Sequence, residues 1–241
     1  MELLDKYAHV FNEAKYDNMS MKDIIKEAIK LNLDFTGLDF SHEDLSGVDF
    51  SPIDLVDVCF CDACLNECKF DYVIRCDFYE SKLTDAVFSG KRYATGEIRH
   101  CDFTDTDLTH TKFGDINFID CDFTGADLRL LKFSDYVTFS KCNFTDAKLN
   151  GVKIEYRWDA TDCDFKYTDL SGCDFSEGCL DGCNFEQAKL IGCVFHWTSL
   201  FHTCFNNADM SHSNLRYADF SFADLTGADL TSADTTETVF P

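Results

Sequence analysis

Cysteine is the residue type with the richest potential chemistry in this chain, with 14 copies in 241 residues. Cys59, Cys61, Cys64 and Cys68 lie close together, and clustered thiolates are typical zinc ligands. Whether these four can share one ion depends on the element that carries them.

The other reactive side chains form no familiar catalytic motif. The seven histidines are scattered, none lies in an HExxH segment, and there is no GxSxG, P-loop or GxGxxG sequence. Aspartates are abundant, but they recur at a fixed interval, just before a large apolar residue, which is typical of a solvated repeat position. We therefore predict that the protein is not an enzyme.

A repeat of five residues organises most of the chain. Between Cys163 and Phe195 a large apolar residue occupies every fifth position, and a small residue lies two positions before it. This period fits neither an α-helix nor a strand, and it indicates a solenoid of repeated units. The register weakens or slips at Asp71–Arg75, Tyr93–Ile98, Tyr136 and Glu155–Asp162.

The repeat covers residues 33–241, whereas residues 1–32 show the apolar spacing of helices. Ser20 is the expected N-cap of the second helix, with Asp23 three residues later. We predict that 1–32 forms a helical cap on the first coil. The alternative is a helical arm that binds a partner.

Two stretches, CDFTGADL (Cys121–Leu128) and ADFSFADLTGADLTSAD (Ala218–Asp234), resemble the A(D/N)LXX signature of the pentapeptide-repeat family. The resemblance implies an all-β solenoid, a right-handed quadrilateral β-helix with four pentapeptides in each coil. The large residue and the small one before it then point inward. Phe165 and Phe185 should therefore share one wall and Phe175 the opposite wall, with leucines on the two walls between them.

In this register nine cysteines occupy the small inward position, where a free thiol behaves as a small apolar group. They are Cys68, Cys76, Cys101, Cys121, Cys142, Cys163, Cys173, Cys183 and Cys193. The outward thiols are Cys59, Cys61, Cys64, Cys179 and Cys204. Because Cys68 faces inward, the four clustered thiols cannot converge, and we predict no metal site and no cofactor.

The net charge of −23 with 45% hydrophobic residues indicates a folded body with a negative surface. Such a surface disfavours nucleic acid and anionic membranes and favours basic partners. No basic signal-peptide start and no apolar run of spanning length are present, so we expect a cytoplasmic protein. The segment Tyr72–His100 is slightly positive and forms a neutral waist.

Two more stretches, FSGKRYATGEIRHC (Phe88–Cys101) and EYRWDATDCDF (Glu155–Phe165), resemble the Qnr quinolone-resistance subfamily. This resemblance implies a DNA-mimicking, end-to-end dimer that binds bacterial type II topoisomerases and protects them from fluoroquinolones. Asp71–Arg75 is short where Qnr proteins carry a projecting loop, a second loop is absent, and the extra helices are N-terminal rather than C-terminal. Those loops are tied to protection in the subfamily, which puts that activity in doubt here.

The leading hypothesis is a DNA mimic that occupies the basic groove of DNA gyrase or topoisomerase IV and modulates it, or protects it from quinolones or gyrase toxins. The alternative is an acidic structural or adaptor rod with another protein partner. The candidate partner-binding residues are Asp34, Asp39, Asp44, Asp49, Asp54, Asp57, Asp62, Tyr72, Arg75, Tyr156, Arg157 and Trp158. The alternatives are a solubilising role for the carboxylates and a core-filling role for Trp158.

The last coil has no evident cap, and an open solenoid end exposes core side chains and unpaired backbone. We therefore expect a homodimer through the C-terminal coils. The candidate interface residues are Leu225, Leu230, Val239 and Phe240.

Overall fold

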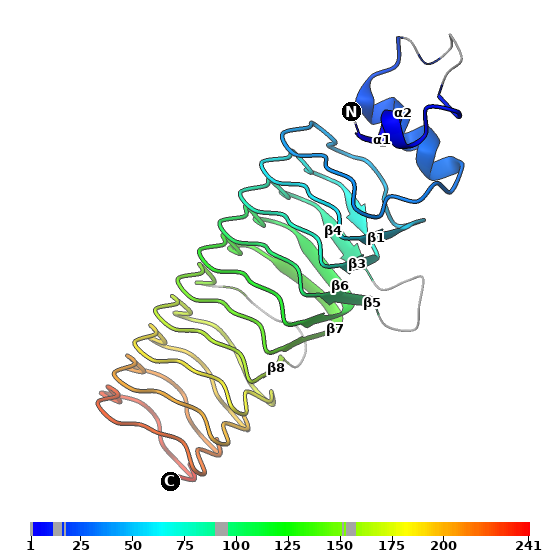
Figure 1. Cartoon of the computed structure of the whole chain (residues 1–241). Helices are drawn as coiled ribbons and strands as arrows, with labels where there is room; N and C mark the ends of the chain where they lie inside the picture. Colours follow the sequence, from blue (N-terminus) through cyan, green and yellow to red (C-terminus); the bar gives the residue numbers. More distant parts are fainter. Residues whose placement is uncertain (1, 12–15, 17, 90–95, 151, 153–157) are drawn as a thin grey trace.

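The computed structural model describes residues 2–11, 16, 18–89, 96–150, 152 and 158–241, without the side chains of 134–136. The chain forms a long rod of stacked coils, with the N-terminal helices at one end and the C-terminus at the other (Figure 1). Parallel bridges join successive coils, usually between residues that are four repeats apart, as between Asn184 and Cys204. The predicted solenoid of quadrilateral coils is confirmed.

We name the four sides of the rod by the inward residue with which each begins. The first face begins at Phe40, the second at Leu45, the third at Phe50 and the fourth at Leu55. The longer strands all lie on the third and fourth faces. They are β1 (Asp54–Val56), β2 (Lys69–Phe70), β3 (Tyr72–Ile74), β4 (Val87–Ser89), β5 (Gly96–Arg99), β6 (Lys112–Ile119), β7 (Lys132–Ser140) and β8 (Asp159–Thr161).

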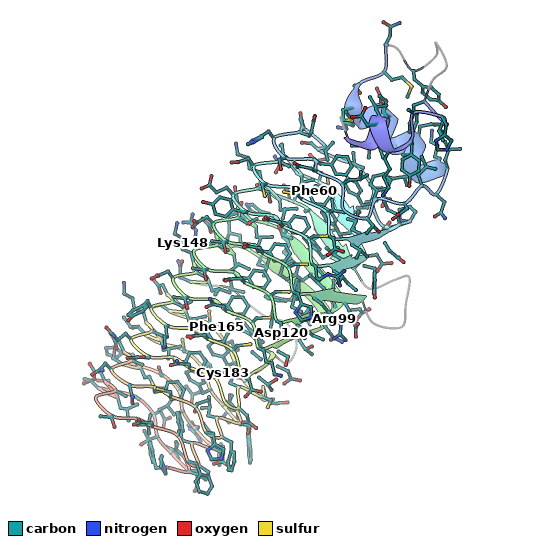
Figure 2. The ribbon with its side chains drawn as sticks, viewed as in Figure 1. Phe60, Arg99, Asp120, Lys148, Phe165 and Cys183 are labelled. Atoms are coloured by element: carbon teal, nitrogen blue, oxygen red, sulfur yellow. The ribbon has the colours of Figure 1, made fainter. Side chains whose placement is uncertain are left out.

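The inward side chains form columns along the rod, as the repeat predicts. On the first face phenylalanine rings stack coil upon coil; the centroids of Phe103 and Phe123 are 4.8 Å apart, with an interplanar angle of 2°. Figure 2 places Phe60 and Phe165 within this core. On the third face Phe175 stacks on Phe195 at 5.1 Å, whereas the second face is lined mainly by leucines. Each buried ring contributes about 1.5–3 kcal/mol to stability.

The small inward residues also join coils by hydrogen bonds. The Cys68 thiol donates to the Leu45 carbonyl at 3.1 Å, and the Thr106 hydroxyl donates to the Phe78 carbonyl at 2.9 Å. All nine predicted inward cysteines are buried and all five predicted outward ones are half-buried, which confirms their placement. The inward thiols therefore pack as small groups and also act as donors.

The outward residue just before a large inward residue often stabilises the corner by accepting a hydrogen bond from the backbone two residues later. Asp102 accepts a hydrogen bond from the Thr104 amide at 2.8 Å, and Asn143 accepts one from Thr145 at 3.0 Å. Two residues after the large one the backbone is commonly left-handed, as at Asp105 with φ 54°. This conformation favours Gly, Asn and Asp. The recurrent aspartates are therefore structural acceptors as well as solvated charges.

Helices cover the first coil. They are α1 (Glu2–Lys6) and α2 (Met21–Lys30), and α2 has the predicted N-cap, because the Asp23 amide donates to Ser20 Oγ at 3.2 Å. Ile25 is fully buried in the same apolar cluster as Phe35, and the Tyr7 hydroxyl donates to the Asp34 carbonyl at 2.7 Å. No helix among the described residues is long and apolar enough to cross a membrane.

Every departure from the regular four-repeat coil lies between the second and fourth faces, around the corner that joins the third face to the fourth. Asp54 pairs with Tyr72, so that coil is two residues short, whereas Val87 pairs with Lys112 across a coil with five additional residues. One extra residue enters β7 beside Gly114–Ile116, and another lies between Leu149 and Ala160. In every coil the first-face residue and the second-face residue that follows it are five positions apart along the chain.

Candidate functional site

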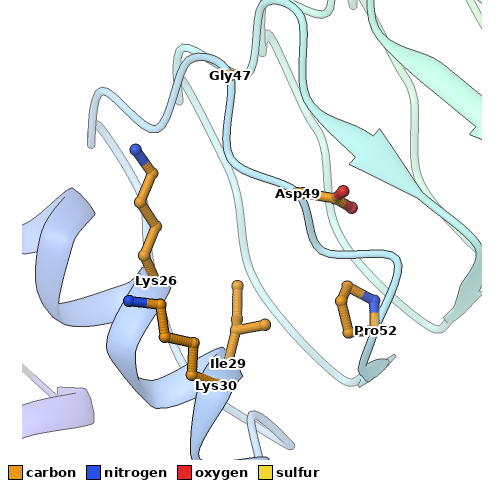
Figure 3. Close-up of a pocket in the computed structure, with 6 residues that line it drawn as sticks. All are labelled: Lys26, Ile29, Lys30, Gly47, Asp49 and Pro52. Atoms are coloured by element: carbon orange, nitrogen blue, oxygen red, sulfur yellow. The ribbon is translucent and has the colours of Figure 1, made fainter.

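Two hollows lie on the described surface of the rod. One, of about 320 Å³, lies between α2 and the first coils and is lined by Lys26, Ile29, Lys30, Gly47, Asp49 and Pro52 (Figure 3). The Asp49 carboxylate points away from the two helix lysines and lies 3.9 Å from Lys69 Nζ. The other hollow, of about 360 Å³, is lined by Thr109, His110, Arg129, Leu130 and Asn150, and there the Thr109 hydroxyl donates to Asp107 at 2.7 Å. Neither lining pairs a nucleophile with a base, so the outer surface is the better candidate.

An acidic strip runs along the first face and the corner that follows it. It is formed by the outward residues Asp39, Asp62, Asp77, Glu80, Asp102, Asp105, Asp122, Asp146, Asp164, Glu186 and Asp224. None of these eleven side chains is buried. Among the corresponding described positions the strip contains a single lysine, Lys166, which lies 3.5 Å from Glu186. The net charge of the strip is therefore −10.

The strip is held in place by corner geometry. The amide and hydroxyl of Thr226 donate to Asp224, and this keeps the pKa of that carboxyl below its usual range. The Asp105 carboxylate lies over Gly125, where a Cβ atom would stand 2.3 Å from Asp105 Oδ1. Gly125 also has φ 69°, a conformation that favours glycine and that Asp105 and Asp146 adopt at the same corner of neighbouring coils.

The charge density of the strip can be compared with that of a nucleic acid strand. Asp39 and Asp224 are nine coil steps apart, which is about 43 Å at ~4.8 Å per coil. Ten net charges over this length give one per ~4.3 Å, against one phosphate per ~3.4 Å of a single DNA strand. The strip therefore approaches the linear charge density of one strand.

The opposite side of the rod is different. The outward residues of the third face include Lys69, Lys112 and Lys132, all exposed. The neutral waist seen along the sequence does not interrupt the strip, because Asp77 and Glu80 from that segment lie within it. The third face also carries the exposed Asp49, Asp174 and Asp234, so its charges are mixed, whereas those of the strip are almost all negative.

The structure distributes the predicted acidic residues around the rod instead of gathering them. Asp39 lies on the first face, Asp44 on the second, Asp49 on the third and Asp54 on the fourth, with Asp34 one coil earlier and Asp57 and Asp62 at corners. Only Asp39 and Asp62 of this set belong to the strip.

Two predicted partner-binding residues contact each other. Arg75 Nε and Nη2 donate to the two carboxylate oxygens of Asp57 at 2.6 and 2.7 Å. This bidentate pair lowers the pKa of Asp57 through its hydrogen bonds. Arg75 therefore offsets part of the negative charge at this corner.

Trp158 requires a correction. It was predicted as a partner-binding residue, but it is only 2% exposed. Its ring lies 6.0 Å from Phe133 and 5.0 Å from Phe175, where it fills the third-face column at a coil with an inserted residue. Tyr72 is half-buried on β3, and Tyr156 and Arg157 lie outside the described residues.

The clustered thiols are placed as predicted, but with one unexpected contact. Cys64 lies on the second face and Cys68 is buried. Cys59 and Cys61, however, have their sulfur atoms 2.9 Å apart, and Asp77 from the next coil lies beside them. The sequence alone did not bring Asp77 to this place, because the intervening coil is two residues short.

The C-terminal end exposes apolar groups. Val239 is 50% and Phe240 is 43% exposed, while Leu225 and Leu230 are half-buried. Two aromatic pairs lie nearby on the corners beside the fourth face, Trp197–Tyr217 stacked at 4.6 Å and Phe201–Phe222 at 5.0 Å. Sequence reasoning missed these pairs; their spacing of about one coil is the signal that identifies them.

Comparisons with known proteins agree with the repeat. The sequence model of the family described as pentapeptide repeats matches residues 101–135, 168–207, 179–216 and 195–231. No curated protein sequence matches the chain. The similar solved structures include HetL, a pentapeptide repeat protein involved in heterocyst differentiation regulation from the cyanobacterium Nostoc sp. Strain PCC 7120, with 22% identity, coverage of 92% of this chain and 95% of HetL, and a TM-score of 0.44.

A trypsin-treated variant of QnrB1, a plasmid-mediated fluoroquinolone resistance protein, is 18% identical over 83% of this chain and 90% of its own, with a TM-score of 0.47. Rfr23 from the cyanobacterium Cyanothece 51142 is 12% identical over 82% and 91%, with a TM-score of 0.17. The matched repeats lie within the four-sided coils, so residues 101–135 and 168–231 are similar in sequence to pentapeptide repeats and share the coil geometry of the rest of the rod.

Proposed function

We propose that this protein is a non-enzymatic DNA mimic whose acidic strip binds the basic DNA-binding groove of a bacterial type II topoisomerase. The observation that carries the proposal is the acidic strip, whose mean charge density approaches that of one DNA strand, although the coil of Cys204 contributes no carboxylate to it. A partner that binds DNA by neutralising phosphates can neutralise carboxylates with the same lysines and arginines.

The negative charge exceeds what the fold needs. Asn143 and Asn184 accept the same corner hydrogen bonds as the aspartates of the first face. Aspartate at the other corners therefore adds charge without a geometric requirement. The corner bonds also hold the carboxylates in place, so that little side-chain freedom remains to be lost on binding.

Supercoiling by purified gyrase, with and without ciprofloxacin, tests the proposal. Wild-type protein should inhibit supercoiling or rescue it from the drug. A strip variant carrying Asp62→Asn, Asp105→Asn and Asp146→Asn should need roughly tenfold more protein, equivalent to about 1.4 kcal/mol.

A matched control removes the same charge elsewhere. Asp85→Asn, Asp115→Asn and Asp162→Asn change corner residues with the same left-handed backbone, but outside the strip. This variant should behave like wild type. Equal loss in both variants would show that net charge alone matters, and no wild-type effect in either assay would reject the topoisomerase as partner.

A second candidate function is an adaptor rod with another protein partner. The pairs Trp197–Tyr217 and Phe201–Phe222, in which only Tyr217 is half-buried, favour it, because aromatic side chains are enriched at protein interfaces. Pull-downs with Trp197→Ala and Phe222→Ala, compared with the strip variant, separate the two functions. Loss of a partner only with the aromatic variants would support the adaptor.

The N-terminal helices are better tested by surface changes than by deletion, because they bury Phe35. Lys26→Glu with Lys30→Glu alters the exposed side of the hollow beside α2 and should leave the core intact (Figure 3). Loss of a partner with this variant would show that the helices are an arm as well as a cover.

A further inference from the structure

Cys59, Cys61 and Asp77 form a cluster whose two thiols the proposed function does not use, although Asp77 also belongs to the acidic strip. Their ligand atoms, two sulfurs and one carboxylate oxygen, all lie within 4.8 Å of one another. All three residues are half-buried on the first face. The two cysteines flank Phe60 on the outside of one coil, and Asp77 pairs with Cys59 from the next coil.

A neighbouring rung of the same solenoid provides an internal comparison. Cys64 occupies on the second face the position that Cys59 occupies on the first, and each sulfur lies 3.1 Å from a serine hydroxyl of the preceding coil. Beside Cys64, however, the chain places Asn66 and Lys82 instead of a second thiol and a carboxylate. The scaffold alone therefore does not produce the cluster.

We propose that Cys59, Cys61 and Asp77 bind one zinc-class divalent cation, with a water molecule as the fourth ligand. Two sulfurs and one carboxylate suit the borderline-soft Zn²⁺ better than Mg²⁺ or Ca²⁺, which prefer all-oxygen sites. The surrounding acidic strip favours a cation further.

The geometry needs a small adjustment. In a tetrahedral site with Zn–S bonds of ~2.3 Å the sulfurs stand about 3.8 Å apart. The present separation of 2.9 Å would therefore open by rotation of the two thiol side chains. Asp77 Oδ1 accepts the Tyr79 amide at 2.9 Å, which orients the carboxylate beside the two thiols.

The chemistry is a simple exchange. As two metal–sulfur bonds form, the two thiol protons pass to solvent, and no electron is transferred. A disulfide between Cys59 and Cys61 would instead need an oxidant and would leave Asp77 without a role. The carboxylate is the reason for favouring a metal.

Titration of the full-length protein with Co²⁺ under reducing, anaerobic conditions tests the site. One equivalent per chain should produce sulfur-to-cobalt charge-transfer absorption, and one equivalent of Zn²⁺ should abolish it. Cys59→Ser and Cys61→Ser should each remove the absorption. Asp77→Asn should weaken binding at least tenfold, since even outer-sphere partners cost roughly 10–100-fold.

Cys64→Ser is the matched control and should bind Co²⁺ like wild type. Asp77→Asn keeps the corner acceptor that Asn143 provides elsewhere, so its circular dichroism should match wild type. Absence of the absorption in folded wild-type protein, or equal loss in Cys64→Ser, would overturn the site. So would a Cys59–Cys61 disulfide found by mass spectrometry in protein isolated with its thiols blocked. None of these results depends on gyrase, so the metal site and the proposed function fail separately.

Discussion

The two ends of the rod are built from the same coil but are finished differently. At the N-terminal end α2 covers the first coil, and Phe35 is 1% exposed. At the C-terminal end Phe240 is 43% exposed and Leu230 is half-buried. A solenoid coil buries its core only against a neighbour, so each end needs a cover. The two ends therefore differ in how much of the core this chain itself covers.

The largest expected effect is a difference in the free energy of unfolding between core substitutions at the two ends. Ile25→Ala empties a fully buried position under the cap and should lower the free energy of unfolding by about 2–5 kcal/mol. Leu230→Ala removes a side chain that is already half-exposed and should cost about 1 kcal/mol in dilute protein. Urea unfolding measures both.

Protein concentration sharpens this test. If a second copy covers the C-terminal end, the cost of Leu230→Ala should rise with concentration, while that of Ile25→Ala should stay constant. Equal costs for the two variants in dilute protein would contradict the difference between the ends.

The next effect concerns association. We propose a homodimer with an isologous contact between the two C-terminal coils. Val239→Asp combined with Phe240→Asp should halve the mass measured by light scattering, because it places charge in the apolar contact. Phe222→Asp changes a side chain that is 69% exposed on the flank of the rod, and the dimer should persist. A monomeric wild type at micromolar concentration would contradict the proposal.

The smallest expected effect is that of pH on the corners near both ends. Hydroxyl and amide donors from Ser46 lower the pKa of Asp44, and those from Thr231 lower the pKa of Asp229, below the usual value of 3.8. A carboxyl with a lowered folded pKa stabilises the fold above its unfolded pKa, and this stabilisation is lost as the pH falls through the folded value. Stability should therefore decline below about pH 4.

Asparagine isolates this contribution, because it keeps the corner acceptor but does not titrate. Between pH 7 and pH 3, Asp44→Asn and Asp229→Asn should each lose less stability than wild type in thermal unfolding. The differences should be small, since both carboxylates are exposed. Identical pH profiles for the variants and wild type would show that these corners do not contribute.

Much of the fold could be predicted because inward residues recur every five positions. That period placed the phenylalanine columns and the nine buried thiols, and the Ser20 cap followed from local helix signals. The candidate sites could not be predicted in the same way. A regular coil of four full repeats would align Cys59 with Tyr79, whereas the actual coil is two residues shorter and aligns it with Asp77.

Inserted residues likewise change which side chains of successive coils come into contact, and the repeat pattern alone does not show this. Trp158 lies in a coil that is one residue longer than four repeats; the sequence allowed a core-filling role for it, but the third-face column that it fills is defined only by the neighbouring rings. The acidic strip combines residues from nine coils whose lengths differ, so a charge profile along the sequence blends it with the lysines of the third face. The five-residue pattern was sufficient to predict which side chains point inward, but not which residues of successive coils lie side by side.

The confinement of irregular coil lengths to one side of the rod makes the protein a natural display scaffold. The pairing of β4 and β5 with β6 already accommodates five additional residues between Ser89 and Gly96. The first-face residues of the neighbouring coils nevertheless remain paired with one another. A foreign peptide inserted there would project away from the strip. The length of the chain at this corner can thus change, by evolution or by design, while the first and second faces keep their alignment from coil to coil.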